Sequence, residues 1–523
     1  MKIITKIWQN TLATVGVVRR CLLSGGKNIA TKRSQRWRPI ASISALLVAS
    51  VALMPVWAAQ GGEGYSFQVL AKLGDNVPPV GGGDDGVDFT FDFEPGEINN
   101  RGQVAFGADL TVGGEGVFLT DARGNLTALA RTGDTSPDGK TYGPLFLGTI
   151  TNNDSGGAAF VFHRNGFDFP ALLAQDAALY RSTPRTGVSA ELLPGAAAPG
   201  GGTFHGFNFR PSLNNGGTIA FSGLIETTLG PGNPGGADNL RLGFGIFTVD
   251  GRHHVSKVVR PGDSAPGSNT FDFAVNPWTN DGGEVAFDGH AQEETCIKFG
   301  ASFPAGNQIF CATSVYLWSK QNGRIVEIAR QNTTPVPGDP DFRFNYAFGP
   351  QLNNQGDVAY FGAYGKAVDV DGVETFLIPG DGNVLVNNTG IFLYSHGASV
   401  TVARPGDSMP GGGHMISAGF FTGEMGLNNN GMVSFTATLD TDDNGDGFSD
   451  TGLYAWSHGT LTLIARSGTV LPGTLGTIAG LRPPALPDFL TTFSGAANNE
   501  RGQVVFQAAL TKGDGVMLLA TPK

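Results

Sequence analysis

Short stretches of alternating apolar and polar residues, separated by turn residues, run along the chain from about residue 64 onward. Within residues 90–134 this pattern predicts four strands, at 90–98, 103–110, 116–120 and 125–131. The first two predicted strands flank the sequence Asn-Asn-Arg-Gly, in which Asn tolerates turn geometry and Gly supplies a positive φ. Helical periodicity is absent over the same part of the sequence, so the pattern predicts an all-β fold.

The Asn-containing turn belongs to a string that recurs seven times. It consists of Asn, two variable residues, Gly, one variable residue, two small or branched residues, and Phe or Tyr. The repeat turns lie at 99–102, 153–156, 214–217, 280–283, 353–356, 428–431 and 499–502. The aromatic residues that close the string are Phe106, Phe160, Phe221, Phe287, Tyr360, Phe435 and Phe506. Seven copies of one four-stranded unit indicate a repeat architecture.

The two ends of the array complement each other. The last unit has three predicted strands, and the missing fourth strand is found at the start, where 67–75 matches 126–134. A ring explains this split, whereas a linear solenoid does not. The sequence therefore predicts a single seven-bladed β-propeller of four-stranded antiparallel blades over 59–523, with 64–76 supplying the outer strand of the last blade. A β-solenoid and tandem sandwiches are the alternatives.

These repeats resemble the NxxGxxAF tandem-repeat proteins of bacteria, which are exported and mostly uncharacterised. The resemblance covers residues 64–523 and rests on all seven copies. It supplies no enzymatic activity to carry over. The strand–turn–strand pattern is also similar to periplasmic WD40-like propellers, in which Asp-Gly occupies the turn.

Residues 1–58 are predicted to be an extended signal peptide. Nine basic residues and no acid occur in 1–38, an apolar stretch follows from Ile40 to Trp57, and small residues surround the expected cleavage site after Ala58. An uncleaved anchor is the alternative. The first residues, MKIITKIWQN, resemble the extended signal peptide region of Gram-negative autotransporters. That resemblance implies export to the extracellular space or the outer-membrane surface, with the periplasm as the alternative.

The charge composition limits the kinds of molecule that the protein is expected to bind. Loss of the nine basic residues of the signal changes the net charge from −11 to −20, and no basic run remains. Binding to nucleic acid is therefore not expected, whereas an acidic surface suits cations. No transmembrane segment is predicted after signal removal, and a monomer is favoured. The 79 glycines fit a chain rich in turns, and 36 phenylalanines can build a core.

Cys296 and Cys311 are the two cysteines that remain after signal removal, 15 residues apart. An even pair in an exported protein predicts a disulfide that stiffens one loop. A two-cysteine metal site that includes His290 is the alternative.

Loop lengths differ between the two faces of the predicted ring. The turns between first and second strands are short and nearly identical. The connections between second and third strands are long, at 162–174, 224–243, 289–313, 363–388 and 438–451. Loops that lengthen on a fixed scaffold commonly carry binding, so the sequence predicts ligand or partner docking on the long-loop face.

One long loop has the pattern of a calcium loop. Its oxygen-bearing residues follow the spacing D-x-N-x-D-G-x-x-D, with the expected ligands Asp442, Asn444, Asp446, the backbone of Phe448, and Asp450. The bidentate Glu of an EF-hand is missing, since Leu453 stands at that position, and so are flanking helices. The sequence predicts a structural calcium ion here, with a solvated acidic turn as the alternative. Asp369 and Asp371 form a weaker pattern in another loop.

A basic residue recurs at the end of the fourth strand, at Lys72, Arg131, Arg260, Arg330, Arg404 and Arg466. A charged ring that binds a polar ligand is one interpretation. The favoured interpretation is ion pairing between neighbouring blades, because features repeated in nearly every blade usually serve the scaffold.

The sequence contains no H-E-x-x-H, G-x-S-x-G or P-loop motif, and no catalytic residue can be named from it. His396 and His458 occupy equivalent Ser-His-Gly turns. The leading hypothesis is an exported binding module whose partner is an unidentified extracellular protein or glycan. An extracellular polysaccharide lyase or hydrolase with a site at the central channel, and a structural cell-surface protein, are the alternatives.

Overall fold

The computed structural model describes most of the chain after residue 63. The described residues are 64–80, 85–111, 114–121, 123–143, 150–164, 176–226, 243–267, 270–291, 296–299, 308–311, 313–365, 367–370, 373–376, 389–418, 425–445, 447, 449–481 and 495–523. All regular elements among them are strands. The described residues include no helix that could cross a membrane. The proposed signal peptide, 1–58, lies outside the described residues.

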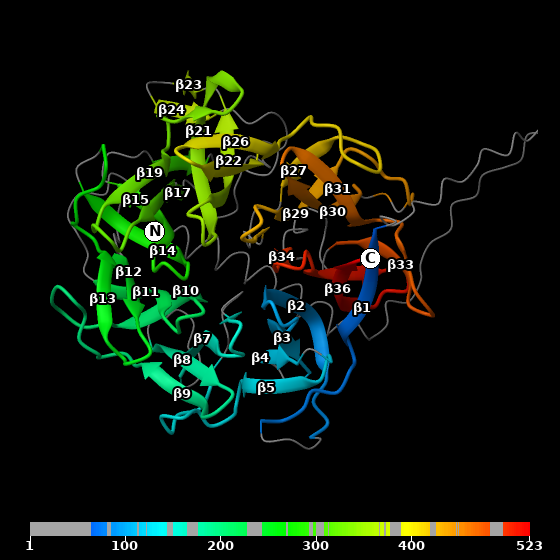
Figure 1. Ribbon diagram of the computed structural model, residues 1–523, viewed down its shortest axis with the longest axis horizontal. Coiled ribbons are helices and arrows are strands. Elements are labelled where there is room, and N and C mark those ends of the chain that lie inside the picture. The colour runs from blue at the N-terminus through cyan, green and yellow to red at the C-terminus, as the bar shows by residue number, and fades with distance from the viewer. Residues whose placement is uncertain are drawn as a thin grey trace, which may run out of the picture.

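Seven small antiparallel sheets stand around a central axis, which confirms the predicted seven-bladed propeller (Figure 1). The strands of the first three blades, from the axis outward, are β2 (Phe89–Ile98), β3 (Val104–Leu110), β4 (Glu115–Thr120) and β5 (Leu126–Arg131); β6 (Ile150–Asn152), β7 (Ala158–His163), β8 (Ala177–Thr183) and β9 (Gly187–Leu192); and β10 (Gly206–Leu213), β11 (Ile219–Glu226), β12 (Gly243–Val249) and β13 (Val255–Val259).

The next two blades carry additional short strands. Blade four consists of β14 (Phe271–Thr279), β15 (Val285–Ala291), β18 (Ser314–Trp318) and β19 (Ile325–Ala329), with the hairpin β16 (Cys296–Phe299) and β17 (Gln308–Cys311) in its long loop. Blade five consists of β20 (Pro335–Val336), β21 (Asp339–Leu352), β22 (Val358–Gly365), β25 (Thr389–Ser395) and β26 (Ala398–Ala403), with the hairpin β23 (Ala367–Val370) and β24 (Val373–Phe376).

In the last two blades two short segments pair with the second strand in place of one continuous inner strand. Blade six consists of β27 (Met415–Ala418), β28 (Gly426–Leu427), β29 (Val433–Leu439), β30 (Thr451–Ser457) and β31 (Thr460–Arg466). Blade seven consists of β32 (Val470–Leu471), β33 (Gly476–Gly480), β34 (Ala497–Asn498), β35 (Val504–Leu510), β36 (Gly515–Pro522) and the N-terminal strand β1 (Tyr65–Lys72).

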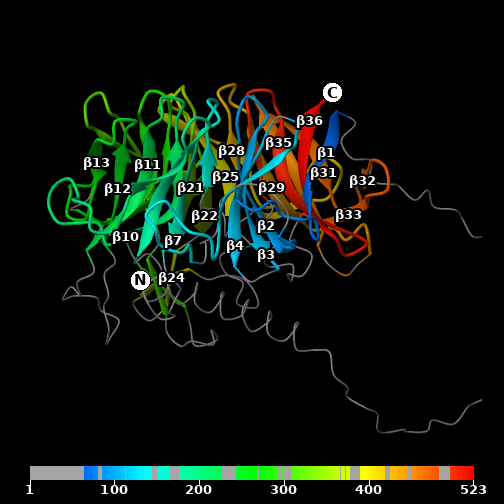
Figure 2. The same ribbon diagram turned by 90° about the horizontal axis from the view of Figure 1, so that it is seen from below.

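The N-terminal strand closes the ring, as the sequence predicted. Strand β1 runs antiparallel to β36, with Phe67 opposite Ala520 and Lys72 opposite Val516. The Phe67 ring also meets the edge of Phe506, with 6.3 Å between centroids. Blade seven is therefore built from both ends of the described chain, which lie side by side in Figures 1 and 2.

The repeat aromatics form the core of the ring and are all fully buried. In six blades the aromatic lies opposite a second aromatic on the third strand, as in Phe106 and Phe118, whose centroids are 5.4 Å apart. A Cβ added at Gly116 would come within 2.6 Å of the Phe118 ring. Glycine at the start of the third strand therefore makes room for the aromatic two residues later.

The seven repeat asparagines form a closed ring of hydrogen bonds on the axis. Each side-chain Nδ2 donates to the backbone oxygen of the next repeat asparagine, at 2.8 to 3.2 Å, in the order Asn99, Asn153, Asn214, Asn280, Asn353, Asn428, Asn499 and back to Asn99. In the first turn, the Asn99 Oδ1 accepts hydrogen bonds from the backbone N–H groups of Arg101 and Gln103. One side chain thus closes its own turn and joins two blades.

The two faces of the ring differ as the sequence predicted. We call the face that carries the seven repeat turns the turn face, and the opposite one the long-loop face. Strand β36 ends at the turn face, because Ala520 pairs with Val504 directly after the last repeat turn. Figure 2 shows this end of the chain above the ring and the hairpin strand β24 below it.

The asparagine ring leads to a first prediction, on stability. An Asn214→Ala variant loses the bond to the Asn280 carbonyl, which keeps its own turn's bond from the Gly283 N–H, and it removes the acceptor of the half-buried Thr218 N–H. We expect it to reduce the free energy of unfolding by about 2–4 kcal/mol, measured by chemical denaturation. The control is Asn322→Ala in an exposed hairpin, where Asn322 accepts one bond, from the Arg324 N–H. Equal losses in both variants would contradict a special role for the ring.

Candidate functional site

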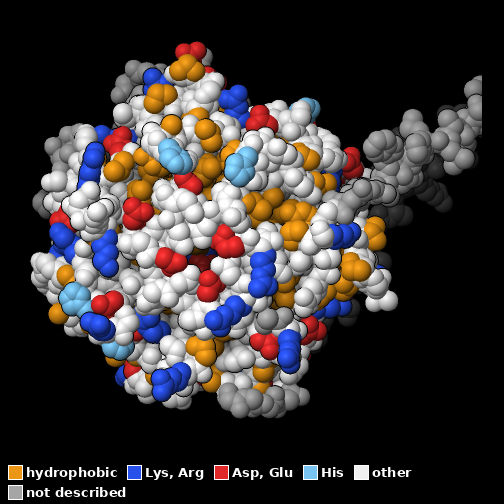
Figure 3. Space-filling model, viewed as in Figure 1, with side chains coloured by type: hydrophobic (Ala, Val, Ile, Leu, Met, Phe, Trp, Pro, Cys, Tyr) orange, Lys and Arg blue, Asp and Glu red, His pale blue; other side chains and the backbone are white. Residues whose placement is uncertain are grey.

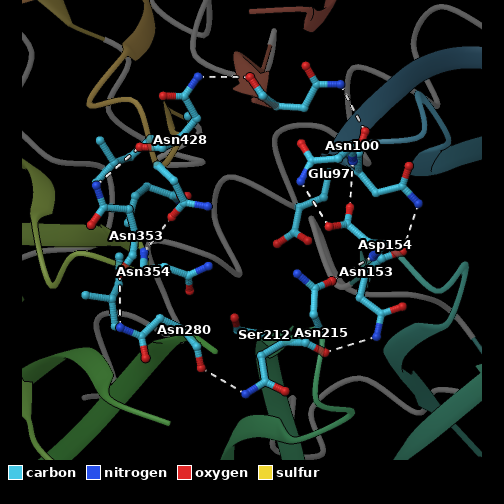
Figure 4. A pocket seen from close by; sticks show the side chains of 18 of the residues that line it. Glu97, Asn100, Asn153, Asp154, Ser212, Asn215, Asn280, Asn353, Asn354 and Asn428 are labelled. Atoms are coloured by element: carbon cyan, nitrogen blue, oxygen red, sulfur yellow. Dashed lines mark hydrogen bonds between the residues drawn. The ribbon is translucent and has the colours of Figure 1, made fainter. Parts of the chain in front are cut away.

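A cavity of about 150 Å³ lies on the axis at the turn face. Its wall comes from the inner strands and turns of all seven blades. Figure 3 shows acidic side chains gathered around this central hollow, and Figure 4 shows the residues that surround it. We call it the central pocket.

The rim of the central pocket is a second closed ring of hydrogen bonds. It consists of the residue after each repeat asparagine: Asn100, Asp154, Asn215, Asp281, Asn354, Asn429 and Glu500. Each backbone N–H donates to the side-chain oxygen of the next member at 2.6 to 3.0 Å, and the N–H of Glu500 donates to Asn100 (Figure 4). This rim ring runs parallel to the asparagine ring.

The three acids of the rim ring are separated by asparagines whose amides they accept. Asp154 accepts from the backbone N–H and from Nδ2 of Asn100. Asp281 accepts from Nδ2 of both Asn215 and Asn354. Glu500 accepts from the Asn429 Nδ2 at 2.6 Å. These carboxylates are therefore bound to the scaffold and compensated by amide dipoles.

Below the rim, Oε1 of Glu97 is buried without a hydrogen-bond partner among the described residues. Oδ1 of Asn152 and Oδ1 of Asn498 also lack a partner, but these side chains lie between blades, where their Nδ2 groups donate to the carbonyls of Gln103 and Met432 in the preceding blade. Figure 4 shows the Glu97 carboxylate pointing toward the open middle of the ring.

The surroundings of Glu97 fix one of its two oxygens. Oε2 accepts from Oγ1 of Thr151 at 2.6 Å and from the backbone N–H of Asn152 at 3.2 Å. Burial raises the pKa of Glu97, while the Arg210 guanidinium and these hydrogen bonds act in the opposite direction. The other oxygen, Oε1, is buried and has no hydrogen-bond partner among the described residues.

The wall across the axis includes one aromatic side chain. Trp278 lines it together with Ser212 and Gln351. The Arg210 guanidinium lies 5.9 Å from the centre of the Trp278 ring and donates to the Ile150 carbonyl. Arg210 therefore lies beside the central pocket without being part of its lining.

A second buried carboxylate lies between blades four and five. Asp288 accepts from Nδ2 of Asn276 at 2.7 Å and from the backbone N–H of Gly349 at 3.1 Å. Burial raises the pKa of Asp288 to about 7, although both hydrogen bonds act against the shift. This carboxyl joins two blades and changes its charge near neutral pH.

The predicted calcium loop is partly described, and no metal-holding group of three or more His, Cys, Asp or Glu occurs in the described part of the chain. Asp450 Oδ2 accepts from the Arg466 guanidinium at 3.0 Å and from Thr441 at 2.7 Å. Asp442 and Asn444 lie exposed at the loop tip, whereas Asp446 and Phe448 lie outside the described residues. Asp450, the residue at the ninth position of the predicted calcium loop, is thus ion-paired with Arg466. The bound calcium ion stays a prediction.

The two cysteines lie opposite each other. Cys296 and Cys311 are register partners in the β16–β17 hairpin. This register places the two Cα atoms directly opposite each other on neighbouring strands, as a cross-strand disulfide requires. The disulfide itself stays a prediction.

The repeated arginines serve the scaffold. The Arg260 guanidinium donates to the carbonyls of Pro199 and Gly201, and Arg330 donates to the Gly267 carbonyl. Each thus reaches the turn that follows the preceding blade's outer strand. Arg131 reaches the corresponding turn through an ion pair with Asp85 at 2.7 Å. The interpretation as a joint between neighbouring blades is supported, although backbone carbonyls replace most of the expected aspartates.

The equivalent histidines are turn residues. His396 and His458 have φ values of 52° and 48°, and each ring nitrogen lies within 2.9 Å of the hydroxyl of the preceding serine. They lie at corresponding places in blades five and six, so they belong to the repeat and not to a site.

Most of the predicted docking loops lie outside the described residues, namely 165–175, 227–242, 292–295, 300–307, 312, 366, 371–372 and 377–388. The leading hypothesis from the sequence placed docking on the long-loop face, and the enzyme alternative placed a site at the central channel without naming its residues. The residues of the central pocket stand directly before and after the repeat asparagines, at positions where the seven copies differ. Comparison of those positions across the copies would have revealed the carboxylates.

The fold and this axial arrangement define the class: the protein is a seven-bladed β-propeller with an acidic, amide-ringed central pocket. The chain belongs to a family of unknown function, DUF7453, whose model matches residues 40–514. No curated protein matches the sequence.

Solved structures with propeller domains are similar at low identity. A Pyrococcus horikoshii acylaminoacyl peptidase is 12% identical with a TM-score of 0.38, over 80% of this chain and 49% of its own. This chain therefore spans about half the length of that relative. An α-L-arabinofuranosidase of Fusarium graminearum is 8% identical (TM-score 0.34, 72% and 92% covered). The Aleuria aurantia lectin, a six-bladed propeller, is also 8% identical (TM-score 0.34, 74% and 98% covered).

Asp288 gives a prediction on pH dependence. Its pKa of about 7 in the folded state lies above its ordinary value of 3.8. Its contribution to stability is therefore complete below about pH 4 and is lost as the pH rises through 7. We expect wild type to lose about 2–3 kcal/mol of unfolding free energy relative to Asp288→Asn between pH 5 and pH 8, measured by denaturation at each pH. Exposed Asp341→Asn is the charge-matched control and keeps the wild-type slope. Parallel pH profiles for wild type and Asp288→Asn would refute this.

The calcium loop gives a further prediction. With millimolar calcium present, we expect a chelator to lower the melting temperature of the mature protein by about 1–3 °C, because an exposed site with few carboxylates binds weakly. An Asp442→Asn variant loses the shift. No difference between calcium and chelator in wild type rules out a bound calcium ion.

Proposed function

We propose that the protein is an exported binding module that recognises a small ligand in the central pocket and does not transform it. The observation that carries this proposal is the state of the pocket carboxylates. Asp154, Asp281 and Glu500 are engaged by asparagine amides, which leaves Glu97 as the one lining carboxylate with an oxygen free of partners.

Most glycoside hydrolases use two carboxyl groups beside the scissile bond, one as general acid and the other as general base or nucleophile. Amide-bound carboxylates of the rim ring cannot rotate toward a substrate without opening the ring that joins the blades. The described lining also lacks histidine, lysine, arginine and tyrosine. Recognition by fixed hydrogen-bond acceptors therefore fits the central pocket better than acid–base catalysis.

The long-loop face is the second surface of this proposed module. The hairpins β16–β17 and β23–β24 arise from the long loops of neighbouring blades, and strands β16 and β24 contact each other. Together they extend the ring on this face, which suits docking of an extracellular protein or glycan. Export follows from the signal-like segment 1–58, and the site of action is the cell surface or the periplasm of a Gram-negative bacterium.

One screen tests the proposal. The mature chain, 59–523, and a Glu97→Gln/Trp278→Ala double variant are compared on a glycan array and by ligand-observed NMR with small polar molecules. We expect small-molecule hits that vanish in the double variant and are not consumed over hours. Glycan hits that survive in the double variant point to the long-loop face.

Two results would contradict the proposal. Consumption of a hit that depends on Glu97 would favour the enzyme alternative. Small-molecule hits that bind both proteins equally would remove the central pocket as the binding site. The melting temperature of the double variant serves as the control for folding.

A further inference from the structure

The outer hairpins of the turn face carry most of its basic side chains. These hairpins join the third and fourth strands of the blades, and in blade seven the ends of β36 and β1 take their place. They hold two acids, Asp121 and Asp250, and six exposed basic residues, which are Arg123, Arg185, Arg252, Lys320, Arg324 and Lys523. No ion pair within the described part of the chain involves Arg123, Arg185 or Arg252. Their charges are exposed and are not used by the scaffold.

The acids of the turn face are bound to the scaffold. Asp121 and Asp250 each accept two backbone N–H groups of their own hairpin, at 2.8 to 3.0 Å. Glu284 and Asp357 accept from Nδ2 of the repeat asparagine of their own turn at 2.9 Å. The acids of the rim ring lie at the axis and accept amides as described above. Figure 3 shows Lys and Arg side chains outside this acidic centre.

The long-loop face has the opposite charge. Acids follow the second or fourth strands there, at Asp75, Asp134, Asp263, Asp407, Asp440 and Asp514. The outer strand β5 has 6 residues, so it separates the two faces by about 20 Å at about 3.4 Å per residue. That separation is about twice the Debye length of about 10 Å in roughly 0.1 M salt. The net charge of the whole chain therefore does not decide what the turn face attracts.

Three consecutive blades add aromatic side chains to the turn face. Trp318, Tyr394 and Trp456 are half-buried and lie at the turn-face end of the third strand in blades four, five and six. Each is the register partner of the valine that begins the second strand. Trp and Tyr side chains with one part in an apolar core and the other in water are enriched at membrane interfaces.

The N-terminal segment joins the ring on the same face. Tyr65 pairs with Pro522, and the Gly64 carbonyl accepts from the backbone N–H of Lys523 at 2.8 Å. The apolar stretch 40–57, which is expected to be a signal peptide or an anchor, therefore precedes a strand that begins at the turn face. A connection to a membrane through this segment favours the turn face as the membrane side.

We propose that the turn face docks onto the surface of an anionic phospholipid bilayer. The basic residues lie on several sides of the axis and the hairpins reach a similar height in Figure 2, so a flat surface contacts them together. A linear anionic polymer would contact only one sector. Each Lys or Arg near an anionic headgroup layer strengthens binding about five-fold.

This inference goes beyond the proposed function, because it does not depend on a ligand in the central pocket. Docking turns the mouth of the central pocket toward the headgroups. The long-loop face then points away from the membrane and stays open to an extracellular protein or glycan.

Sedimentation with vesicles tests the proposal. The mature chain, 59–523, is mixed at about 0.1 M salt with vesicles of phosphatidylcholine alone, or of equal parts of phosphatidylcholine and phosphatidylglycerol. We expect at least ten-fold stronger partitioning to the anionic vesicles. Partitioning is lost at about 1 M salt, where the Debye length falls to about 3 Å.

Tryptophan fluorescence identifies the face that docks. The mature chain has three tryptophans, which are Trp278 in the central pocket and Trp318 and Trp456 beside the outer hairpins. All three belong to the turn face, so bound vesicles are expected to protect them at least two-fold against quenching by acrylamide, a neutral quencher. Binding with unchanged quenching means that another face docks, which overturns the proposal.

Two matched variants link binding to the outer hairpins. Arg123→Gln/Arg185→Gln/Arg252→Gln removes three charges from them, and we expect at least ten-fold weaker partitioning. Lys140→Gln/Lys257→Gln/Lys512→Gln removes three exposed charges elsewhere and stays within two-fold of wild type. Equal losses in both variants attribute binding to net charge and overturn the proposal. Melting temperatures serve as the control for folding.

The remaining outcomes separate this proposal from its rivals. Equal partitioning to both kinds of vesicle, or none to either, overturns it. Binding of soluble dextran sulfate without binding to vesicles assigns the turn face to an anionic polymer and also overturns it. Small-molecule binding in the central pocket is measured without vesicles, so failure here leaves the proposed function standing.

Discussion

The structure depends on the repeat asparagine, whose side chain makes two kinds of hydrogen bond in each blade. In each repeat turn, the asparagine oxygen accepts backbone N–H groups of its own turn, while its amide nitrogen donates to the carbonyl of the next asparagine. The first use fixes the turn between the two innermost strands of a blade. The second use sets the angle between neighbouring blades. Because the last asparagine donates to the first, at 2.9 Å between Asn499 and Asn99, the bonds form a cycle in which no member has a free end.

Most of the fold could be predicted from the sequence because the same bonds recur in every unit. The blade number, the strand order and the pairing of β1 with β36 all follow from counting copies and noticing that the ends complement each other. The aromatic partner on the third strand, such as Tyr180 opposite Phe160, was not predicted, because the pairing depends on the strand register.

The candidate site could not be predicted in the same way. Glu97 and Glu500, which both line the central pocket, are separated by about four hundred residues in the chain, and each stands at a position where the copies differ. A ring brings such positions together on its axis, but the sequence alone does not say which of them keep a free oxygen. That depends on which donors lie within reach, such as Thr151 beside Glu97. Loop length, the available signal, indicated the opposite face.

The joint between the two ends of the chain has a consequence for folding. Strand β1 contributes the edge of a blade whose other strands come from the far end of the chain, so the Ser66 hydroxyl donates to the carbonyl of Thr521, 455 residues away. Closing so long a loop is slow, because its entropy must be lost before the contact is gained. When the chain is synthesised from its N-terminus, six blades can fold while β1 has no strand to pair with. Strand β1 pairs with β36 only after the last blade has been synthesised, so the ring closes only when all preceding units are present.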